Sequence, residues 1–438
     1  MMERTEDKRG YLLLLLGALV FLFLRAPIPL VRGFLYAEEA TGYLRYAWDA
    51  PVVRALLAPH QGYFSIYPNV VGVIAARVVP LEYVGIFCGW CTIAVQLLMV
   101  LVVAQCEIFD NFKLKTLAVA VSLLTVPTLS VAMSSIFAQF FLAVCTGAIL
   151  MSDVERLRLF RGSVLLLGGL TGVANCILGP FFIWAAWRDH SRKRAIQAGI
   201  LAVCTVIQVI VVHHMMQVQD RGLTRHSALP YVLGAYLING PVSQLLTSWS
   251  GHIGCRVLMT PLLARWSSII WVLAEVATVV TFFFFVWLLV RGGTAARRFG
   301  QIALFSLVVG LAGALPLNER LMCDGGARYF FLCNVFVGFG LICALKKRLK
   351  IMNRVPRGLA LMLACILISG IYDDVTLWTR PPFMWDWQTE VAHWRADPNY
   401  EIRVAPEYWI GLVLTPKHAN TDLPAYIYDS NNFGSKLK

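Results

Sequence analysis

The feature that most constrains this chain is a series of apolar runs, each long enough to cross a bilayer and separated from the next by a short polar break. A spanning helix needs about 20 predominantly apolar residues. Hydrophobic residues make up 58% of the 438-residue sequence and charged residues 14%, proportions that exclude an ordinary soluble domain. The sequence therefore predicts an all-α integral membrane protein, a polytopic bundle of about 10 to 12 transmembrane helices.

The first apolar run, at residues 11–24, has two readings, a signal peptide or a first span. Arg25, Pro27 and Pro29 follow it, and the small residues of a cleavage site do not. We therefore expect the run to be retained as the first span. If the N-terminus is cytoplasmic, the segment that follows this span is extracytoplasmic.

Three basic clusters between the apolar runs predict the orientation of the bundle. They are "WRDHSRKR" (187–194), "RGGTAARR" (291–298) and "KKRLKIMNRVPR" (346–357). Because Lys and Arg resist translocation, each cluster is expected in the cytoplasm. The net charge of +13 therefore reports orientation, and no nucleic-acid partner is predicted.

The spans between these clusters then follow in order. Residues 266–290 and 329–345 should run inward, and residues 299–315 and 359–372 outward. The C-terminal tail from residue 373 is predicted to be extracytoplasmic, and its nine acidic against six basic side chains agree with that side. The segment 38–62 is expected on the same face.

These spans predict one transmembrane domain over residues 1–372, followed by an extracytoplasmic C-terminal segment over 373–438. The domain is expected to carry a first extracytoplasmic loop at 37–62 and a long one at 215–265. Two places leave the span count open. Two apolar runs at 63–106 are split at "PLEY" (80–83), and residues 162–187 form either one span or two half-helices broken at Gly179-Pro180.

The cysteines and the paired histidines are better explained by packing than by a redox site or a metal site. The "CGWC" at 88–91 has the spacing of a redox dithiol but lies in an apolar helix, so packing is expected. His213 and His214 are adjacent on a helix and do not share a face, which argues against a metal site. Cys255 and Cys323 are predicted to be extracytoplasmic, and a disulfide between them is left open.

The stretch "LYAEEATGYLRYAWDAP" (35–51) places two adjacent acids after the first span. A helix lying along the membrane interface would carry Glu38, Thr41, Arg45 and Trp48 on one face, and Glu39, Tyr43 and Tyr46 on the next. Aromatic rings stack on sugars, and a desolvated carboxylate can take a proton from a hydroxyl. The alternative is a solvated loop. Polar side chains near this stretch and in a later loop complete a set of substrate-binding candidates: Tyr43, Arg45, His60, Gln61, Tyr63 and Asp324.

A second polar loop, "LPLNERLMCDGGARYFFLCN" (315–334), offers a phosphate site. Gly325-Gly326 permits a tight turn before the next span, and Arg328 lies at the start of that span, where helix N–H groups favour an anion. Arg320 adds a second cation. We expect Arg320 and Arg328 to bind phosphate; the alternative is that Arg328 anchors the span at the lipid headgroups.

The acidic pair, the "P-x-x-GY" turn at residues 59–63 and the "RYFFL" that opens a later span resemble bacterial polytopic glycosyltransferases of the GT-C class. In that class the pair usually reads Glu-Asp followed by Gly, whereas here it is Glu38-Glu39 with Gly42 displaced. The resemblance implies a polyprenyl-phosphate-linked sugar donor, an extracytoplasmic active site and an inverting displacement assisted by a carboxylate base. It leaves open whether Glu38 or Glu39 is that base.

The predicted function is a glycosyltransferase of the bacterial inner membrane that moves a sugar to the hydroxyl of a cell-surface or lipid-linked glycan, surrounded by membrane lipids. The alternatives are a transporter or flippase of lipid-linked sugars and a noncatalytic assembly subunit. A transporter would place ionisable groups along the middle of its spans, where Glu275 and Arg77 are the main examples. A divalent cation, Mg²⁺ or Mn²⁺, suits paired carboxylates and phosphate oxygens, but no complete ligand set is evident and metal dependence is left open.

Overall fold

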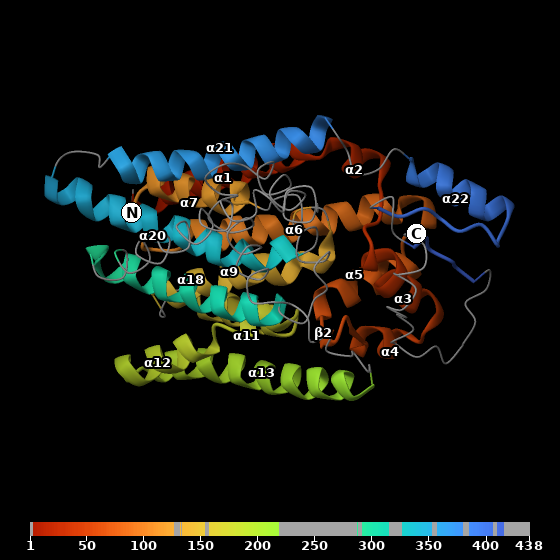
Figure 1. Ribbon diagram of the computed structural model, residues 1–438, viewed down its shortest axis with the longest axis horizontal. Helices are drawn as coiled ribbons and strands as arrows, with labels where there is room; N and C mark the ends of the chain where they lie inside the picture. The colour runs from red at the N-terminus through yellow and green to blue at the C-terminus, as the bar shows by residue number, and fades with distance from the viewer. Residues whose placement is uncertain are drawn as a thin grey trace, which may run out of the picture.

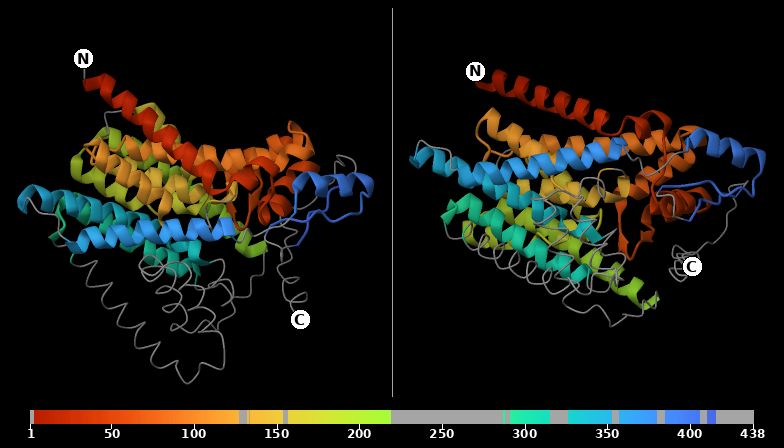
Figure 2. Two further views of the ribbon diagram at one scale, coloured as in Figure 1. Left: turned by 90° about the horizontal axis from the view of Figure 1, so that it is seen from above. Right: turned by 45° about the horizontal axis from the view of Figure 1, so that its top comes forward.

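The computed structural model of the protein describes residues 3–126, 132, 134–153, 157–218, 287, 291–314, 326–352, 357–379, 385–405 and 410–415. Within these ranges the protein is mostly helical, with one two-stranded sheet. The long helices lie side by side along the longest axis of the molecule, and the short elements gather at one end (Figures 1 and 2).

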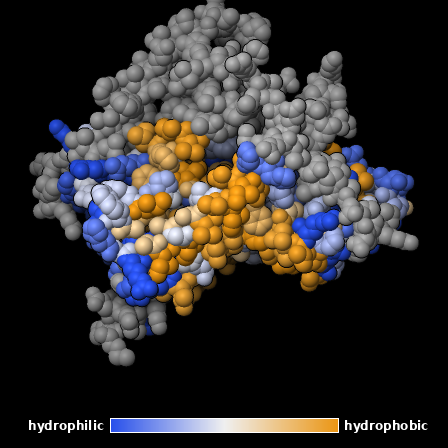
Figure 3. Space-filling view, turned by 90° about the horizontal axis from the view of Figure 1, so that it is seen from below, coloured by the Kyte–Doolittle hydropathy of each residue, from blue (hydrophilic) through white to orange (hydrophobic). Residues whose placement is uncertain are grey.

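Eight helices form the body of the bundle in the described part of the chain. They are α1 (Glu3–Arg25), α6 (Val84–Ala104), α7 (Phe112–Leu124), α9 (Ala138–Met151), α13 (Arg192–Val218), α18 (Gly293–Ala314), α20 (Phe331–Met352) and α21 (Arg357–Thr379). Four stretches here are long and apolar enough to cross a membrane: Leu81–Ala104, Arg192–Met215, Arg328–Lys347 and Arg357–Val375. Figure 3 shows hydrophobic residues gathered across the middle of one face, between hydrophilic ends. The predicted class, an all-α membrane protein, is confirmed, and the total of about 10 to 12 spans stays a prediction.

Aromatic rings and glycines set how closely these helices pack. Phe109 stacks on Phe299, with the ring centroids 6.3 Å apart, and Phe339 meets both rings edge-on at 5.3 and 5.4 Å. A Cβ added to Gly370 of α21 would lie 1.8 Å from the carbonyl oxygen of Leu124 at the end of α7. Such close backbone approach is typical of membrane helices, which pack through small residues.

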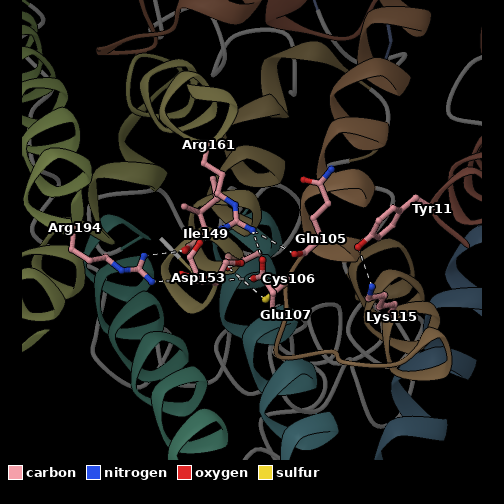
Figure 4. Close-up of polar contacts among 11 residues, drawn as sticks. Tyr11, Gln105, Cys106, Glu107, Lys115, Ile149, Asp153, Arg161 and Arg194 are labelled. Carbon is pink, nitrogen blue, oxygen red and sulfur yellow. Dashed lines mark hydrogen bonds and ion pairs between the residues drawn. The ribbon is translucent and has the colours of Figure 1, made fainter. Parts of the chain in front are cut away.

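The three basic clusters lie at the same end of the bundle, which we call the basic end. Lys347 Nζ lies 3.5 Å from the carbonyl oxygen of Arg291, and Arg298 interacts electrostatically with Arg188. These contacts agree with the prediction that the clusters share one side of the membrane. Other polar contacts at this end join the ends of neighbouring helices, and Figure 4 shows them in close-up.

Residues 162–187 do not form one span. Here the chain forms α10 (Arg158–Gly169), α11 (Val173–Cys176) and α12 (Gly179–Asp189). Arg161 near the start of α10 and Asp189 at the end of α12 both interact with Arg194 at the start of α13, so the chain enters from the basic end and returns to it. Positive φ at Gly172 (109°) and a proline in the first turn of α12 separate the helices. The single span is therefore absent, and the chain is broken twice, at residues 170–172 as well as at the predicted position before Gly179-Pro180.

The opposite end, which we call the site end, is built from short elements between the long helices (Figure 1). They are α2 (Pro27–Arg32), η1 (Glu39–Leu44), α3 (Arg45–Asp49), α4 (Val52–Leu57), β1 (Pro59–His60), β2 (Tyr63–Phe64), α5 (Ile66–Arg77), η2 (Leu81–Tyr83), η3 (Ser135–Phe137) and η6 (Gly326–Phe330). The element η2 separates α5 from α6 where the split at 80–83 was predicted. The stretch expected to form a helix along the interface is helical in two parts, because η1 is a π-helix and α-helical geometry begins at Arg45; its position at the membrane interface stays a prediction.

The C-terminal segment begins later than predicted. Helix α21 continues through Asp373 and Asp374 to Thr379, because Asp374 pairs with Arg25 of α1 at 3.1 Å inside the bundle. Helix α22 (Trp387–Ala396) then packs on η2, where Trp387 Nε1 donates a hydrogen bond to the carbonyl oxygen of Leu81 at 2.8 Å. The predicted domain boundary at 372 thus falls inside a helix.

Candidate functional site

The two acids after the first helix have different surroundings. The side chain of Glu39 is buried, and its Oε1 accepts hydrogen bonds from the backbone N–H of Ser135, at 3.0 Å, and from the Ser135 hydroxyl. Ser135 opens η3, the turn that leads into α9. Glu38 is half-buried and interacts electrostatically with the guanidinium of Arg328. Glu39 therefore fixes the loop to the bundle, while Glu38 faces a cation.

Arg328 lies in η6, immediately before α20, and is held among aromatic rings. Its guanidinium carbon lies 5.5 Å from the ring centroid of Phe137 and 5.6 Å from that of Tyr329. Both distances are within the range of cation–π attraction. The hydroxyl of Tyr63 is within electrostatic reach of both Arg328 and Glu38. One carboxylate, one guanidinium and one phenol from three separate segments thus converge at the site end.

Burial changes the acidity of both carboxyl groups. Desolvation raises the pKa of Glu38, and the charge of Arg328 opposes part of that rise. Desolvation likewise raises the pKa of Glu39, against the hydrogen bonds from Ser135. A carboxyl with a raised pKa is a better proton acceptor at neutral pH than an exposed one. The arrangement therefore suits general-base chemistry.

The "PHQGY" segment forms a β-hairpin that presents polar side chains beside this cluster. Gln61 and Gly62 have φ values of 56° and 88°, the positive values of a type I′ turn between two-residue strands. Tyr63 donates a hydrogen bond to Gln61 Oε1 at 2.8 Å and accepts one from Gln139 Nε2 at 2.8 Å. The Nε2 of Gln61 is buried without a hydrogen-bond partner in the described part of the chain. An unpaired buried donor is costly and is available to a ligand.

His60 lies on the first strand of this hairpin, packed between tyrosines. Its ring centroid is 4.3 Å from that of Tyr43 and 5.6 Å from that of Tyr46. Burial lowers the pKa of His60 to about 4, so the imidazole is neutral at physiological pH. The hydroxyls of Tyr43 and Ser65 lie close together behind it, but neither makes a well-aligned hydrogen bond to another described residue. His60 therefore contributes no positive charge for phosphate and is suited to contact with neutral hydroxyls.

The bundle holds this hairpin from two sides. Gln208 of α13 accepts a hydrogen bond from Phe64 N–H at 3.1 Å and donates one to the Phe64 carbonyl at 2.9 Å. Asn175 of α11 donates to the carbonyl of Gln139 at 3.1 Å and accepts from Thr146 at 2.7 Å. A continuous chain of hydrogen bonds therefore runs from α9 and α11 to Tyr63 and preorganises the site.

The backbone before the acids is fixed by the C-terminal segment. Ala37, the residue before Glu38, has a positive φ of 42°, which is unfavourable for a non-glycine residue. Its N–H donates to the carbonyl of Ala405 at 2.5 Å, and the N–H of Ala405 donates to the carbonyl of Leu35 at 2.9 Å. Nearby, Thr415 donates to Asp49 at 2.5 Å. The tail thus forms one wall of the loop that carries Glu38.

The structure brings together part of the predicted set. Glu38, Arg328 and Tyr63 share one cluster, with Gln61 joined to it through Tyr63, and His60 packs with Tyr43. Arg45 is half-buried at the start of α3. Arg320 and Asp324 lie outside the described residues, as do Cys255 and Cys323.

Residues from the start of α9 were missed by the sequence analysis. Ser135 binds Glu39, Phe137 lies beside Arg328, and Gln139 binds Tyr63. The sequence carries the signal of a helix start there, since Ser134 caps η3 with its side chain. A helix start can be recognised from the local sequence, but its contact with Glu39, 96 residues earlier in the chain, cannot.

The described residues offer no metal site, and the chain matches no known protein in the comparisons made. In the described ranges, no group of three or more His, Cys, Asp or Glu side chains is placed to hold a metal ion. Comparison of the chain with family models, curated proteins and solved structures found no match.

Proposed function

We propose that the protein is a glycosyltransferase of the bacterial inner membrane that transfers a sugar from a polyprenyl-phosphate donor to an acceptor hydroxyl at the extracytoplasmic face. One observation carries the proposal: Glu38 and Arg328, from distant segments, interact at one end of the membrane helices. A transfer of this kind needs one group that removes a proton and one that stabilises the departing phosphate.

In the proposed reaction Glu38 accepts the proton of the acceptor hydroxyl. The acceptor oxygen forms a bond to the anomeric carbon while the bond from that carbon to the phosphate oxygen breaks, with inversion. The electron pair leaves on the polyprenyl phosphate, where Arg328 stabilises the added negative charge through its planar set of donors. Glu39, which is occupied by Ser135, keeps Glu38 in place and does not take the proton.

The hairpin supplies the groups for the sugar. Gln61 Nε2 is an unpaired buried donor, and the neutral His60 ring and the Tyr63 hydroxyl lie on the same two strands. Hydroxyl-rich substrates are bound by neutral donors and acceptors of this kind, with aromatic faces against the ring. The chemistry of the hairpin therefore fits a sugar better than a second charged group.

A transporter or flippase of lipid-linked sugars is the second candidate, and one observation favours it. The half-helices α10 and α12 enter and leave at the basic end. The turn after α10 contacts the chain just after the hairpin, where Ile66 N–H donates to the Leu170 carbonyl at 2.8 Å and Ser65 pairs with Thr171. Broken helices that meet near a binding site are typical of secondary transporters. The same hairpin would then bind a sugar in transit.

The two functions are separated by measuring transfer and translocation on the same preparation. Purified protein in nanodiscs is given a set of synthetic polyprenyl-phosphate sugars and an envelope glycan fraction, and release of polyprenyl phosphate is measured. We expect release that Glu38→Gln abolishes and that Glu401→Gln, a matched change in the tail, leaves unaltered. Movement of the intact donor across proteoliposomes, with no release under any condition, would instead establish the transporter.

A further inference from the structure

A second cluster of charged side chains lies at the basic end, far from the site described above. A cavity that is partly open to solvent lies there between α9, α12, α13 and α18. Arg188, Arg194 and Arg298 line it, together with one carboxylate, that of Asp189. Three cations against one anion leave a surplus of positive charge in a partly closed space.

The first two arginines have fixed positions. Arg188 pairs with Asp189 at 2.5 Å, and its guanidinium carbon lies 4.8 Å from the ring centroid of Trp184. Arg194 is buried and donates hydrogen bonds to the carbonyl oxygens of Ile149 and Ser152 at the end of α9. Figure 4 shows Arg194 directed to that helix end. Arg194 therefore stabilises the fold, as a cation at a helix C-terminus does.

Arg298 of α18 is the cation with the least compensation. It interacts unfavourably with Arg188 and Arg194, and favourably with Asp189, which Arg188 already engages. Arg188 and Arg298 are both only partly buried, so their donors remain accessible from the cavity. A bound anion between them would offset this mutual repulsion.

Apart from Gln301, the rest of the cavity wall is apolar. Leu150, Phe181 and Ile302 line it beside the arginines. Trp184 of α12, which also lines the cavity, is 45% exposed, and Trp187 of the same helix is 71% exposed. Exposed tryptophans close to a basic helix end are typical of the level of the lipid headgroups. The cavity therefore offers a cationic part for a headgroup and an apolar part for the chains that leave it.

We propose that this cavity is a binding site for an anionic membrane lipid, whose phosphate group is held between Arg188 and Arg298. Guanidinium groups bind phosphate oxygens through paired hydrogen bonds, and basic pockets between membrane helices bind anionic headgroups. The site is separate from the Glu38–Arg328 cluster and does not depend on the proposed transfer reaction.

The test measures lipid affinity with the intact, delipidated protein in detergent, by native mass spectrometry. The probes are dioleoyl phosphatidylglycerol, dioleoyl phosphatidylcholine with the same chains, and inorganic phosphate. The variants are Arg188→Gln and Arg298→Gln, with Arg297→Gln as the control, because Arg297 is exposed on the same helix and does not line the cavity. Arg298→Lys keeps the charge and serves if the Gln variant does not fold.

We expect phosphatidylglycerol to bind the unaltered protein more tightly than phosphatidylcholine. Loss of either lining guanidinium should weaken phosphatidylglycerol about tenfold, the effect of one charge-assisted hydrogen bond, and Arg297→Gln should have no effect. Arg298→Lys should weaken it less than Gln does. Equal affinity for both lipids, or an equal loss of phosphatidylglycerol affinity in Arg297→Gln, would overturn the lipid site. Competition by inorganic phosphate at a similar concentration would also overturn it and would assign the cavity to a soluble anion.

Discussion

Glu39 and Ser135 are joined by two hydrogen bonds, one from the backbone N–H and one from the hydroxyl, across 96 residues of sequence. The neighbouring acid, Glu38, instead interacts with Arg328. Two adjacent residues of the same type are therefore assigned different roles by their partners, one in holding the loop and one in the proposed chemistry.

Glu39→Ala should destabilise the protein by about 2 kcal/mol, because it leaves the buried N–H of Ser135 without an acceptor. Glu38→Gln should leave the unfolding temperature nearly unchanged and lower the transfer rate by about 10²- to 10⁴-fold, the usual loss on removing a positioned base. Thermal unfolding in detergent and the release of polyprenyl phosphate are the two measurements. Equal thermal losses in both variants, with transfer retained in Glu38→Gln, would contradict the division of roles.

The pH dependence of transfer should reveal the link between Glu38 and Arg328. Burial raises the pKa of Glu38 and Arg328 opposes that rise, so the base is protonated and inactive below a pKa that lies above the ordinary carboxyl range. In Arg328→Gln the opposing charge is lost, the pKa of Glu38 rises further, and the acidic limb of the rate profile should move to higher pH. The profile is measured at saturating donor, since the same change weakens donor binding. An unmoved limb would mean that another group titrates.

The C-terminal segment should respond to acid through Glu390. Burial works against ionisation of this carboxyl, but hydrogen bonds from Arg403 and Tyr400 outweigh it and lower the pKa of Glu390. Because the folded-state pKa is lowered, the stabilisation is complete above the unfolded value of about 4.3 and is lost as the pH falls through the folded-state pKa. Glu390→Gln should therefore lower the free energy of unfolding of the C-terminal segment by about 1 kcal/mol; the loss is small because Arg403 is largely exposed to solvent. We expect faster proteolysis after Thr379 at pH 7 as a result. Glu401→Gln, in the same segment, is the control, and equal proteolysis in the two variants would refute the role of Glu390.

The orientation of the bundle should be measurable with single cysteines at its two ends. Val53, in α4 at the site end, and Leu159, at the start of α10 at the basic end, are 68% and 89% exposed. In a background without the native cysteines, an impermeant thiol reagent should label Val53→Cys in intact spheroplasts and Leu159→Cys only after the membrane is opened. The reverse pattern would place the proposed active site in the cytoplasm.

Sequence patterns predicted the elements of this fold whose cause is local. The apolar runs predict helices because lipid leaves no other partner for the backbone, and the split at 80–83 is set by Pro80, which favours a break between α5 and α6. The placement of the basic clusters at one end was predicted because Lys and Arg resist translocation across the membrane. The end of α21 was not predictable in this way, since Asp373 and Asp374 look like loop residues until Arg25 is known to lie beside them.

Composition and periodicity were enough to predict a helical membrane protein and to mark Glu38, Glu39 and Arg328 as candidate site residues. Which acid faces the cation was decided by the tertiary structure, because Ser135 of η3 takes the carboxylate of Glu39 while η6 brings Arg328 toward Glu38. Contacts of this kind join segments that are distant along the chain, so local periodicity and composition do not predict them. The same holds for Ala405, whose backbone pairs with that of Ala37 beside the acids because the helices between them return the chain to the same end.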